Sequence, residues 1–559
     1  MRDVPTFRIG QASRSGLRSL VIVLLNTFLA LTVAAQRRER LVDTWKPMHY
    51  NVNIFLSNQL TTIDSATTKV RAAVVKQNVN MIDLDFGELT IDSVNVDAVP
   101  ARFERKPDRL NVQLNRPANK GDVIEITIKY HGIPKDGLIL TNDRDGKPSA
   151  TGDNWPDRVH HWIPCLDHPS AKATVTFTVT APVRDLVVAN GAFEGSHGNF
   201  GGTTTWSFNE SRPIPPYCMV IVVTEGAKLD APGLLTPLSY YVPRTDRDYA
   251  MKGFSPAAPA VAFFSQLIAP YPYEKLALIV GATRFGGMEN SSAIVFGSNI
   301  FEPGKAQDSM SARFGIPERI EDVVAHEIAH QWFGDSVTES TWSDLWLSEG
   351  FATYFAGLFI QRHDGEQAFQ DYMRQAAKRY FAYEQAKRTP IFDRDTEDLF
   401  KLLNPNNYQK GAWVLHMLRS RLGDDAFFRG LRGYYNSHRD ATATTEDLRA
   451  ALEKSSGLNL REFFARWIYG TGHPRYELSW TWSNETKMLN LVLRQLQPEP
   501  AFQNFLPVEI SSSSGSQQIV LKPVGKDTRQ KLRMNGPPTA INIDPANQVL
   551  KEAAVIKGS

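Results

Sequence analysis

The spacing of apolar residues changes twice along the chain, and this pattern most constrains the fold. From residue 44 to about residue 226, apolar and polar residues alternate in short runs, which predicts half-buried antiparallel strands. Between about residues 250 and 470, apolar residues recur every three or four positions, which predicts helices. Alternation returns after Gly470, as in residues 476–482. We therefore expect a multidomain α+β protein.

The length of 559 residues is enough for several hydrophobic cores. We expect a β-rich N-terminal domain over residues 44–226, a mainly helical domain over residues 227–470, and a small C-terminal β-sandwich over residues 471–559. The net charge of +2 comes from interspersed acidic and basic residues. Because nucleic acids are bound by clustered basic residues, we expect no nucleic-acid partner.

The N-terminus carries the features of a secretory signal peptide. Four arginines precede the apolar residues 20–35, which end in Val33-Ala34-Ala35. We expect residues 1–35 to direct export, to the periplasm or outside the cell, with an uncleaved N-terminal membrane anchor as the alternative. No later segment is suited to span a membrane. Only Cys165 and Cys218 remain, so at most one disulfide can form.

The residues with the clearest chemical implication are His326-Glu327-Ile328-Ala329-His330. Two histidines four positions apart lie on one face of a helix and can bind one zinc ion. Glu327 lies beside that face, where it can deprotonate a water at an open coordination position. Chance would produce this pattern in roughly one or two of a hundred chains of this composition.

Glu349 supplies a third ligand from a second predicted helix, which follows Ser343 and Asp344 as possible N-caps. Two imidazoles and one carboxylate leave a tetrahedral zinc with an open fourth position, which is typical of catalytic rather than structural sites. Asp335 and Asp344 either orient a ligand imidazole or simply cap helix ends. We expect one catalytic zinc per chain.

The spacing from His330 to Glu349 resembles the gluzincin pattern, and the surrounding residues are similar to the M1 aminopeptidase family. Further motifs support this resemblance. They are Trp332-Phe333-Gly334-Asp335, Leu345-Trp346-Leu347-Ser348-Glu349-Gly350-Phe351-Ala352, Gly286-Gly287-Met288-Glu289-Asn290, Tyr408-Gln409-Lys410-Gly411 and Trp162-Ile163-Pro164-Cys165-Leu166-Asp167-His168-Pro169.

The resemblance implies a thermolysin-like catalytic domain and an aminopeptidase acting on peptides with a free N-terminus. Glu289 would bind the α-ammonium group, because an unpaired buried carboxylate discriminates against substrates that lack a cation. Substrate binding is expected along Gly286, Gly287, Met288, Glu289 and Asn290. The hydroxyl of Tyr408 would donate to the oxyanion of the reacting carbonyl.

The sequence departs from the family pattern in three places. Trp155 stands where many relatives carry a second ammonium-binding Gln or Glu, and either Asp153 or Asn154 is a candidate replacement. Asp335 replaces the usual Asn. The sequence ends after the predicted β-sandwich, without the helical domain that encloses the cleft in many relatives.

Two other functions remain to be tested. A thermolysin-like zinc endopeptidase would share the metal site but would not need Glu289. A non-catalytic peptide-binding protein of the same fold would be expected to have lost one of the ligands or Glu327. All four residues are present, which favours an enzyme.

Overall fold

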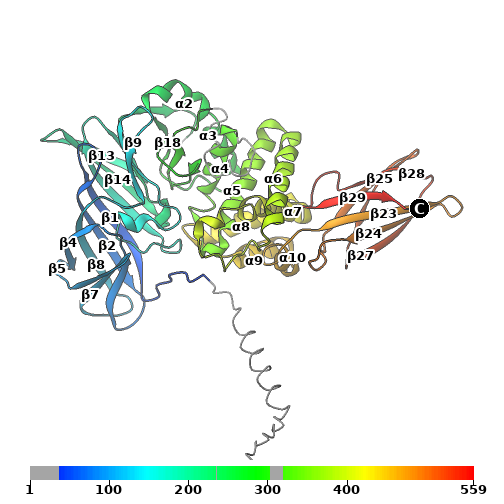
Figure 1. Cartoon of the computed structure of the whole chain (residues 1–559), viewed down its shortest axis with the longest axis horizontal. Helices are drawn as coiled ribbons and strands as arrows, with labels where there is room; N and C mark the ends of the chain where they lie inside the picture. The colour runs from blue at the N-terminus through cyan, green and yellow to red at the C-terminus, as the bar shows by residue number, and fades with distance from the viewer. Residues whose placement is uncertain (1–36, 235, 303–318, 559) are drawn as a thin grey trace, which may run out of the picture.

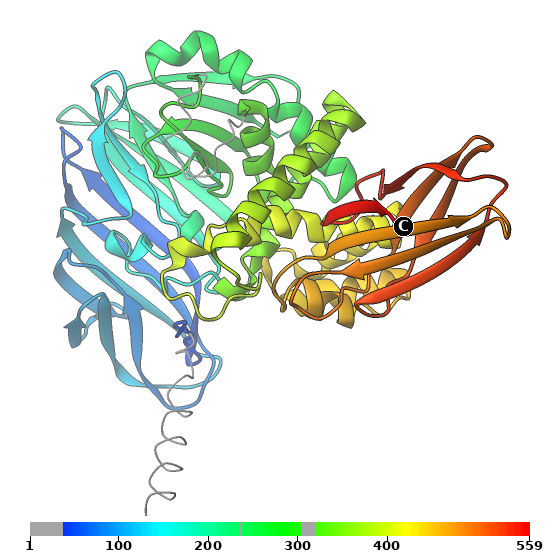
Figure 2. The same cartoon turned by 45° about the vertical axis from the view of Figure 1, so that its right-hand side comes forward.

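The computed structural model describes residues 37–234, 236–302 and 319–558 of the chain. They form a strand-rich part, a helical part and a pair of small C-terminal sheets, in the predicted order (Figure 1). In a view turned by 45°, the C-terminal strands still extend beyond the helices, on the side away from the N-terminal strands (Figure 2). The predicted signal peptide, residues 1–35, lies outside the described residues.

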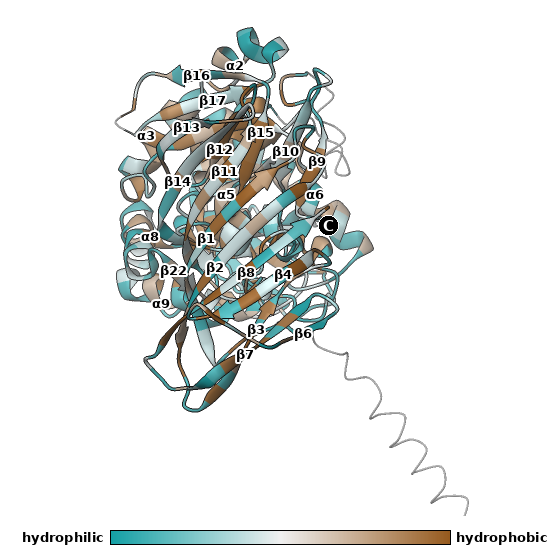
Figure 3. Cartoon of the chain, turned by 90° about the vertical axis from the view of Figure 1, so that its left-hand side faces the viewer, coloured by the Kyte–Doolittle hydropathy of each residue, from teal (hydrophilic) through white to brown (hydrophobic). Residues whose placement is uncertain are grey.

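An eight-stranded sheet of order β13-β14-β11-β1-β2-β8-β4-β5 forms the base of the N-terminal part. Buried and more exposed residues alternate along β2 and β8, as expected where one sheet face packs on a core. Figure 3 colours the residues of this sheet by hydropathy. The N-terminal strands are β1 (Trp45–Leu56), β2 (Ile63–Val74), β3 (Val79–Asp85), β4 (Thr90–Val96), β5 (Val99–Pro100), β6 (Phe103–Lys106), β7 (Arg109–Ala118), β8 (Val123–Gly132), β9 (Leu138–Asn142), β10 (Pro148–Gly152), β11 (Ala173–Pro182), β12 (Leu186–Ala189), β13 (Ala192–Asn199), β14 (Thr203–Ile214) and β15 (Ile221–Thr224).

A five-stranded mixed sheet opens the middle part, and the apolar pattern had not indicated it. Its order is β16-β17-β18-β20-β19, with β17, β18 and β20 parallel. Its strands are β16 (Ala227–Ala231), β17 (Leu238–Val242), β18 (Leu276–Gly281), β19 (Gly287–Met288) and β20 (Ala293–Gly297). Strands β18 and β20 are buried almost continuously, so they show no alternation. The edge strand β19 carries part of the predicted substrate-binding motif.

Helices make up most of the chain from residue 320 to residue 467. They are α4 (Ile320–His330), α5 (Trp346–Asp364), α6 (Glu366–Ala386), α7 (Gly411–Leu422), α8 (Asp424–His438), α9 (Thr445–Ser456) and α10 (Arg461–Trp467), preceded by α2 (Arg247–Gly253) and α3 (Ala257–Leu267). Two short parallel strands, β21 (Val337–Glu339) and β22 (Ala441–Ala443), pair between them. The start of α9 is fixed by a capping box between Thr444 and Asp447.

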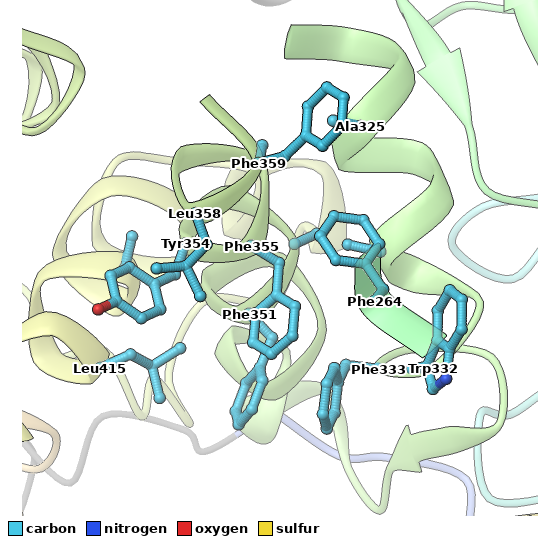
Figure 4. Close-up of a cluster of buried hydrophobic side chains, with 14 of the residues drawn as sticks. Phe264, Ala325, Trp332, Phe333, Phe351, Tyr354, Phe355, Leu358, Phe359 and Leu415 are labelled. Carbon is cyan, nitrogen blue, oxygen red and sulfur yellow. The ribbon is translucent and has the colours of Figure 1, made fainter. Parts of the chain in front are cut away.

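Helix α5 lies at the centre of this part, and its residues 346–360 are all buried. Phe351 and Phe355 lie beside Phe333, with ring centroids 4.3 and 5.2 Å from it (Figure 4). Loss of one such buried phenyl group costs about 3–5 kcal/mol. This aromatic packing therefore holds α5 firmly against the segment that follows α4.

The C-terminal strands form a β-sandwich of two sheets, of order β27-β24-β23-β29 and β26-β25-β28, around a shared apolar core. They are β23 (Arg475–Ser483), β24 (Met488–Gln495), β25 (Leu506–Ser512), β26 (Gly515–Leu521), β27 (Asp527–Arg533), β28 (Pro538–Ile543) and β29 (Glu552–Lys557). Buried His473 joins the sandwich to the helices, since its ring nitrogens lie 2.7 Å from Glu384 Oε2 of α6 and 3.1 Å from Glu552 Oε2 of β29.

A second contact between the helices and the C-terminal part predicts that the stability of the fold falls at acid pH. His416 of α7 donates from Nε2 to the carbonyl of Asn547 (3.1 Å), and burial lowers the pKa of His416 to about 4. An unfolded chain takes up this proton near pH 6.5, so stability is lost as the pH falls from about 6.5 to about 4. We expect this residue alone to lower the free energy of unfolding by about 2 kcal/mol between pH 7 and pH 5.

Urea unfolding of His416→Gln at both pH values measures this effect, since the glutamine amide can still donate to Asn547. The variant should lose about 2 kcal/mol less than the wild type between pH 7 and pH 5. His363→Gln, at an exposed histidine of α5, is the control and should behave as the wild type. An unchanged pH dependence in His416→Gln would show that the buried imidazole is not responsible.

Both cysteines are buried, and neither is in a disulfide. Cys165 lies in the N-terminal core, and Cys218 donates from Sγ to Asp335 Oδ1 at 3.3 Å. Within residues 37–234, 236–302 and 319–558, no helix has both the length and the apolar character needed to cross a membrane.

Candidate functional site

Three predicted ligands meet where α4 packs against α5. The Nε2 atoms of His326 and His330 lie 3.0 Å apart, and Glu349 Oε2 lies 3.3 and 3.4 Å from them. Ligand atoms around a tetrahedral zinc at about 2.0 Å are separated by about 3.3 Å. The three side chains can therefore hold one divalent cation with only small adjustments.

The imidazole of His330 is oriented by the turn after α4 and by α5. Its Nδ1 lies 3.2 Å from the carbonyl oxygen of Phe333, to which it can donate, and 3.0 Å from Ser348 Oγ. Gly334 has a φ of +125°, and a Cβ there would lie 2.5 Å from Ser348 Oγ. These contacts direct Nε2 toward Glu349, as expected for a metal ligand.

The two aspartates considered for this orienting role do not contact the imidazole of His330. Asp335 accepts from Gln331 Nε2 (2.8 Å) and from Cys218, and burial raises its pKa well above the usual range. Asp344 accepts from the backbone N–H of Thr445 (2.9 Å) and thus contacts the start of α9. Asp344 is therefore not an N-cap of α5, which follows Leu345 without a side-chain cap.

Glu327 is buried beside the metal-binding residues, and its position depends on Gly287 of β19. A Cβ at Gly287 would lie 2.4 Å from Glu327 Oε1, so a larger residue would displace the carboxylate. One carboxylate oxygen of Glu327, one of Glu289 and a ring nitrogen of His330 lie within 4.8 Å of one another. The predicted general base thus lies next to both the metal ligands and the predicted ammonium-binding residue.

Tyr408 lies on a π-helical turn, η8 (Asn406–Lys410), and donates from its hydroxyl to Glu349 Oε1 at 2.7 Å. Two glycines allow this approach, because a Cβ on Gly350 of α5 would lie 3.0 Å from the Cα of Gly411. The glycine of the Tyr408-Gln409-Lys410-Gly411 motif therefore has a packing role: it brings the tyrosine to the carboxylate ligand.

Glu289 follows β19 and is only 6% exposed. Burial, opposed by His330 and reinforced by Glu349, raises the pKa of Glu289 to about 7. The same carboxylates act on His330: burial would lower its pKa, but Glu289 and Glu349 raise it to about 10. These groups form one coupled set, in which a bound cation would replace protons.

The site opens into a cavity of about 180 Å³. Gly286, Gly287, Met288 and Glu289 line it, together with the three predicted metal ligands, Glu327 and Tyr408. Asn290 is fully buried and is not among the lining residues, so its contact with substrate stays a prediction.

Sequence reasoning did not identify the opposite wall of the cavity. Helix α6 contributes residues at helical spacing, and no motif marks them. They are Tyr372, Gln375, Ala376 and Arg379. Leu403 and Asn404, which lie between the helices, also line the cavity.

Trp155 lines the cavity, packed edge-on against Phe285, Trp342 and Phe400. The two residues before it, Asp153 and Asn154, contact other parts of the N-terminal segment. Asp153 pairs with Arg158 (2.9 Å), while Asn154 donates to the carbonyl of Met219 and accepts from Trp162 Nε1. Neither residue is among those that line the cavity, and whether either assists ammonium binding stays untested.

Two family models match the chain. The model described as "Peptidase M1 N-terminal domain" matches residues 46–218, and that described as "Peptidase family M1 domain" matches residues 257–467. The second contains His326, Glu327, His330, Glu349 and Tyr408.

Similar proteins carry aminopeptidase names. Aminopeptidase 2 of Candida albicans is 23% identical over 475 residues, which is 82% of this chain and 50% of that protein. Aminopeptidase M1 of Arabidopsis thaliana is 29% identical over 329 residues, 57% of this chain and 36% of that protein. The Tricorn protease-interacting factor F2 of Thermoplasma acidophilum is 27% identical over 407 residues, 70% of this chain and 50% of that protein.

The chain spans about half the length of the curated relatives it matches. The two matched domains follow each other in order and together cover most of the described residues, and the second includes the candidate metal-binding cluster. On these grounds the chain is a member of peptidase family M1.

Proposed function

We propose that this protein is a zinc aminopeptidase, which removes residues from the N-terminus of peptides. The observation that carries the proposal is the buried carboxylate of Glu289, which lines the same cavity as His326, His330 and Glu349. A peptide's α-ammonium group is the natural partner for a buried anion beside a hydrolytic site. The family membership and the names of its relatives support the same activity.

His326, His330 and Glu349 would hold the zinc ion, since their donor atoms already have the separations of a tetrahedral site. When bound, zinc supplies a Lewis acid for the scissile carbonyl and lowers the pKa of a water molecule. The remaining steps are carried by side chains of this protein.

Glu289 pairs with the substrate's α-ammonium group and thereby fixes the first peptide bond beside the metal ligands. The edge strand β19 offers free backbone groups along which the peptide can lie extended. Glu327 takes a proton from the attacking water and then delivers it to the departing amine. The hydroxyl of Tyr408 turns from Glu349 to the oxyanion of the reacting carbonyl.

A panel of aminoacyl chromogenic amides, each paired with its N-acetylated form, tests this proposal. Hydrolysis of the free form alone, lost on chelation and restored by zinc, is the expected result. Equal cleavage of both forms would instead favour an endopeptidase. An absence of both hydrolysis and bound zinc would favour a non-catalytic peptide-binding protein. The panel also reports which first side chain the cavity prefers.

The substitution Tyr408→Phe separates two roles of the tyrosine. If its hydroxyl stabilises the oxyanion, kcat should fall by about 10²- to 10³-fold while the affinity for zinc is unchanged. If it mainly holds Glu349 in place, the affinity for zinc should fall instead. Steady-state kinetics and zinc competition with a chelating dye distinguish these outcomes.

We also propose that the protein is exported by means of residues 1–35. The support is the sequence pattern of four arginines, an apolar run and the small residues Val33-Ala34-Ala35. Sequencing of the mature protein should find Gln36 at its N-terminus. Retention of residues 1–35 in a membrane fraction would indicate an anchor instead.

A further inference from the structure

A second group of potential metal ligands lies in the N-terminal part, formed by Asp108, His160 and His161. One carboxylate oxygen and one ring nitrogen from each histidine all lie within 4.8 Å of one another. The histidines belong to a short 3-10 helix, η1 (Val159–His161), and Asp108 lies in the turn between β6 and β7. The geometry points to a second zinc site at these three residues, separate from the cavity at α4 and α5.

The imidazole of His160 is oriented as a metal ligand would be. Its Nδ1 lies 2.8 Å from Oδ2 of the buried Asp167, to which it can donate, while its Nε2 lies 3.9 Å from Asp108 Oδ1. A carboxylate that accepts from one ring nitrogen fixes the tautomer and leaves the other nitrogen free to bind a metal. The same Asp167 oxygen accepts from the backbone N–H of His160 (3.0 Å), so the ring and its backbone are held together.

The separation of Asp108 and His160 allows both residues to bind one zinc ion with little movement. Tetrahedral zinc places its ligands about 3.3 Å apart, so Asp108 Oδ1 must approach His160 Nε2 by about 0.6 Å. The side chain of Asp108 is 58% exposed and can rotate by that amount. A set of two imidazoles and one carboxylate binds zinc in preference to magnesium or calcium, which prefer oxygen ligands.

Backbone hydrogen bonds hold the 3-10 helix η1 and the β6–β7 turn close together. Gly87 donates from its backbone N–H to the carbonyl of His160 (2.7 Å), and Phe86 donates to that of Asp108 (3.2 Å). A Cβ at Gly87 would lie 2.7 Å from His161 Nδ1, so only glycine allows this contact. Residues 86–87 therefore link the 3-10 helix to the β6–β7 turn.

The nearby charges favour a cation. Two nearby arginines already have carboxylate partners. Arg109 pairs with Asp85, and Arg158 pairs with Asp136 and Asp153. Asp157 lies nearby as well, but burial and Asp167 raise its pKa to about 7, so it carries only part of a negative charge at neutral pH. The competing arrangement is a protonated His160 paired with Asp167 and Asp108, without a metal.

A zinc ion here would also restrain one wall of the cavity at α4 and α5. Trp155 lies five residues before His160, and Arg158 donates from Nε to the carbonyl of Trp155 (2.9 Å). Fixing the 3-10 helix to the β6–β7 turn thus restrains the segment that carries Trp155. With three protein ligands, water would fill the fourth position, and the role inferred from the location of the site is to restrain this segment.

Counting zinc per chain in the full-length protein, by equilibrium dialysis and elemental analysis, tests the proposal. The wild type should bind two zinc ions, and Asp108→Asn should bind one. Asp108 has a φ of +53°, a conformation that Asn tolerates well, so this variant should fold. His160→Asn/His161→Asn should also bind one, as should His326→Asn/His330→Asn, which keeps only the second site.

His131→Asn is the matched control, because His131 also faces a carboxylate, Asp92 (2.9 Å), but among the described residues it belongs to no group of three potential metal ligands. It should retain two zinc ions. One zinc per wild-type chain that is lost in His326→Asn/His330→Asn would overturn the proposal, as would two zinc ions in both Asp108→Asn and His160→Asn/His161→Asn. His326→Asn/His330→Asn reads the second site alone, so one zinc in this variant supports the site whether or not the protein hydrolyses peptides.

Discussion

The substitution Glu327→Gln is expected to lower kcat by about 10³-fold or more, with zinc still bound at His326, His330 and Glu349. Gln has the shape of Glu and fits against Gly287, but it cannot accept a proton from water. Both proton transfers of the proposed mechanism would be lost, while the three metal-binding side chains are untouched. Steady-state kinetics and zinc analysis of the same preparation measure the two quantities.

The same substitution at Glu321 is the matched control, because Glu321 is exposed in the first turn of the same helix, α4. Glu321→Gln should keep the wild-type kcat. If Glu327→Gln lost zinc as well as activity, its effect could not be assigned to proton transfer. If it kept kcat within tenfold of the wild type, another residue would have to be the base.

The grouping of His326, His330 and Glu349 could be predicted from sequence because the geometry of the two histidines is local. Two histidines four positions apart on a helix share one face whatever surrounds them. The structure brings Glu349 to them from α5, at separations suited to zinc. The family motifs supplied the remaining residues, Glu289 and Tyr408, which periodicity alone would have assigned to a loop and to a core.

The surroundings of the ligands could not be predicted, because they depend on packing between distant segments. Ser348 contacts His330 only because α5 crosses the turn at Gly334. Asp335 and Asp344 looked suitable from their positions in the chain, yet they bind Gln331 and Thr445 instead. A carboxylate has several possible partners, and only the tertiary structure selects among them.

The spacing of apolar residues predicted the secondary structure correctly where a strand has one solvent-facing side or a helix has one apolar face. The pattern failed at β18 and β20, which are buried on both faces and therefore read as plain apolar runs. The cluster of Asp108 and His160 was missed for a related reason. Asp108 lies in a turn and His160 in a short 3-10 helix about fifty residues further along the chain, and no periodicity brings these two segments together.

Replacing Glu289 with Gln is expected to lower kcat/KM for peptides with a free N-terminus by about 10²- to 10³-fold. Glu289 is buried, so the substrate's ammonium group would lose a desolvated partner, a change that costs about 2–5 kcal/mol. The metal-binding residues and Glu327 keep their contacts, so zinc content should not change. Kinetics on an aminoacyl chromogenic amide measures the loss.

An N-acetylated substrate shows whether charge recognition is the cause. It carries no ammonium group, so the wild type should cleave it poorly, and Glu289→Gln should not reduce that rate further. The large preference of the wild type for the free form should therefore shrink in the variant. An equal loss on both substrates would instead mean that Glu289 acts through the metal site, because only that effect is independent of the substrate's charge.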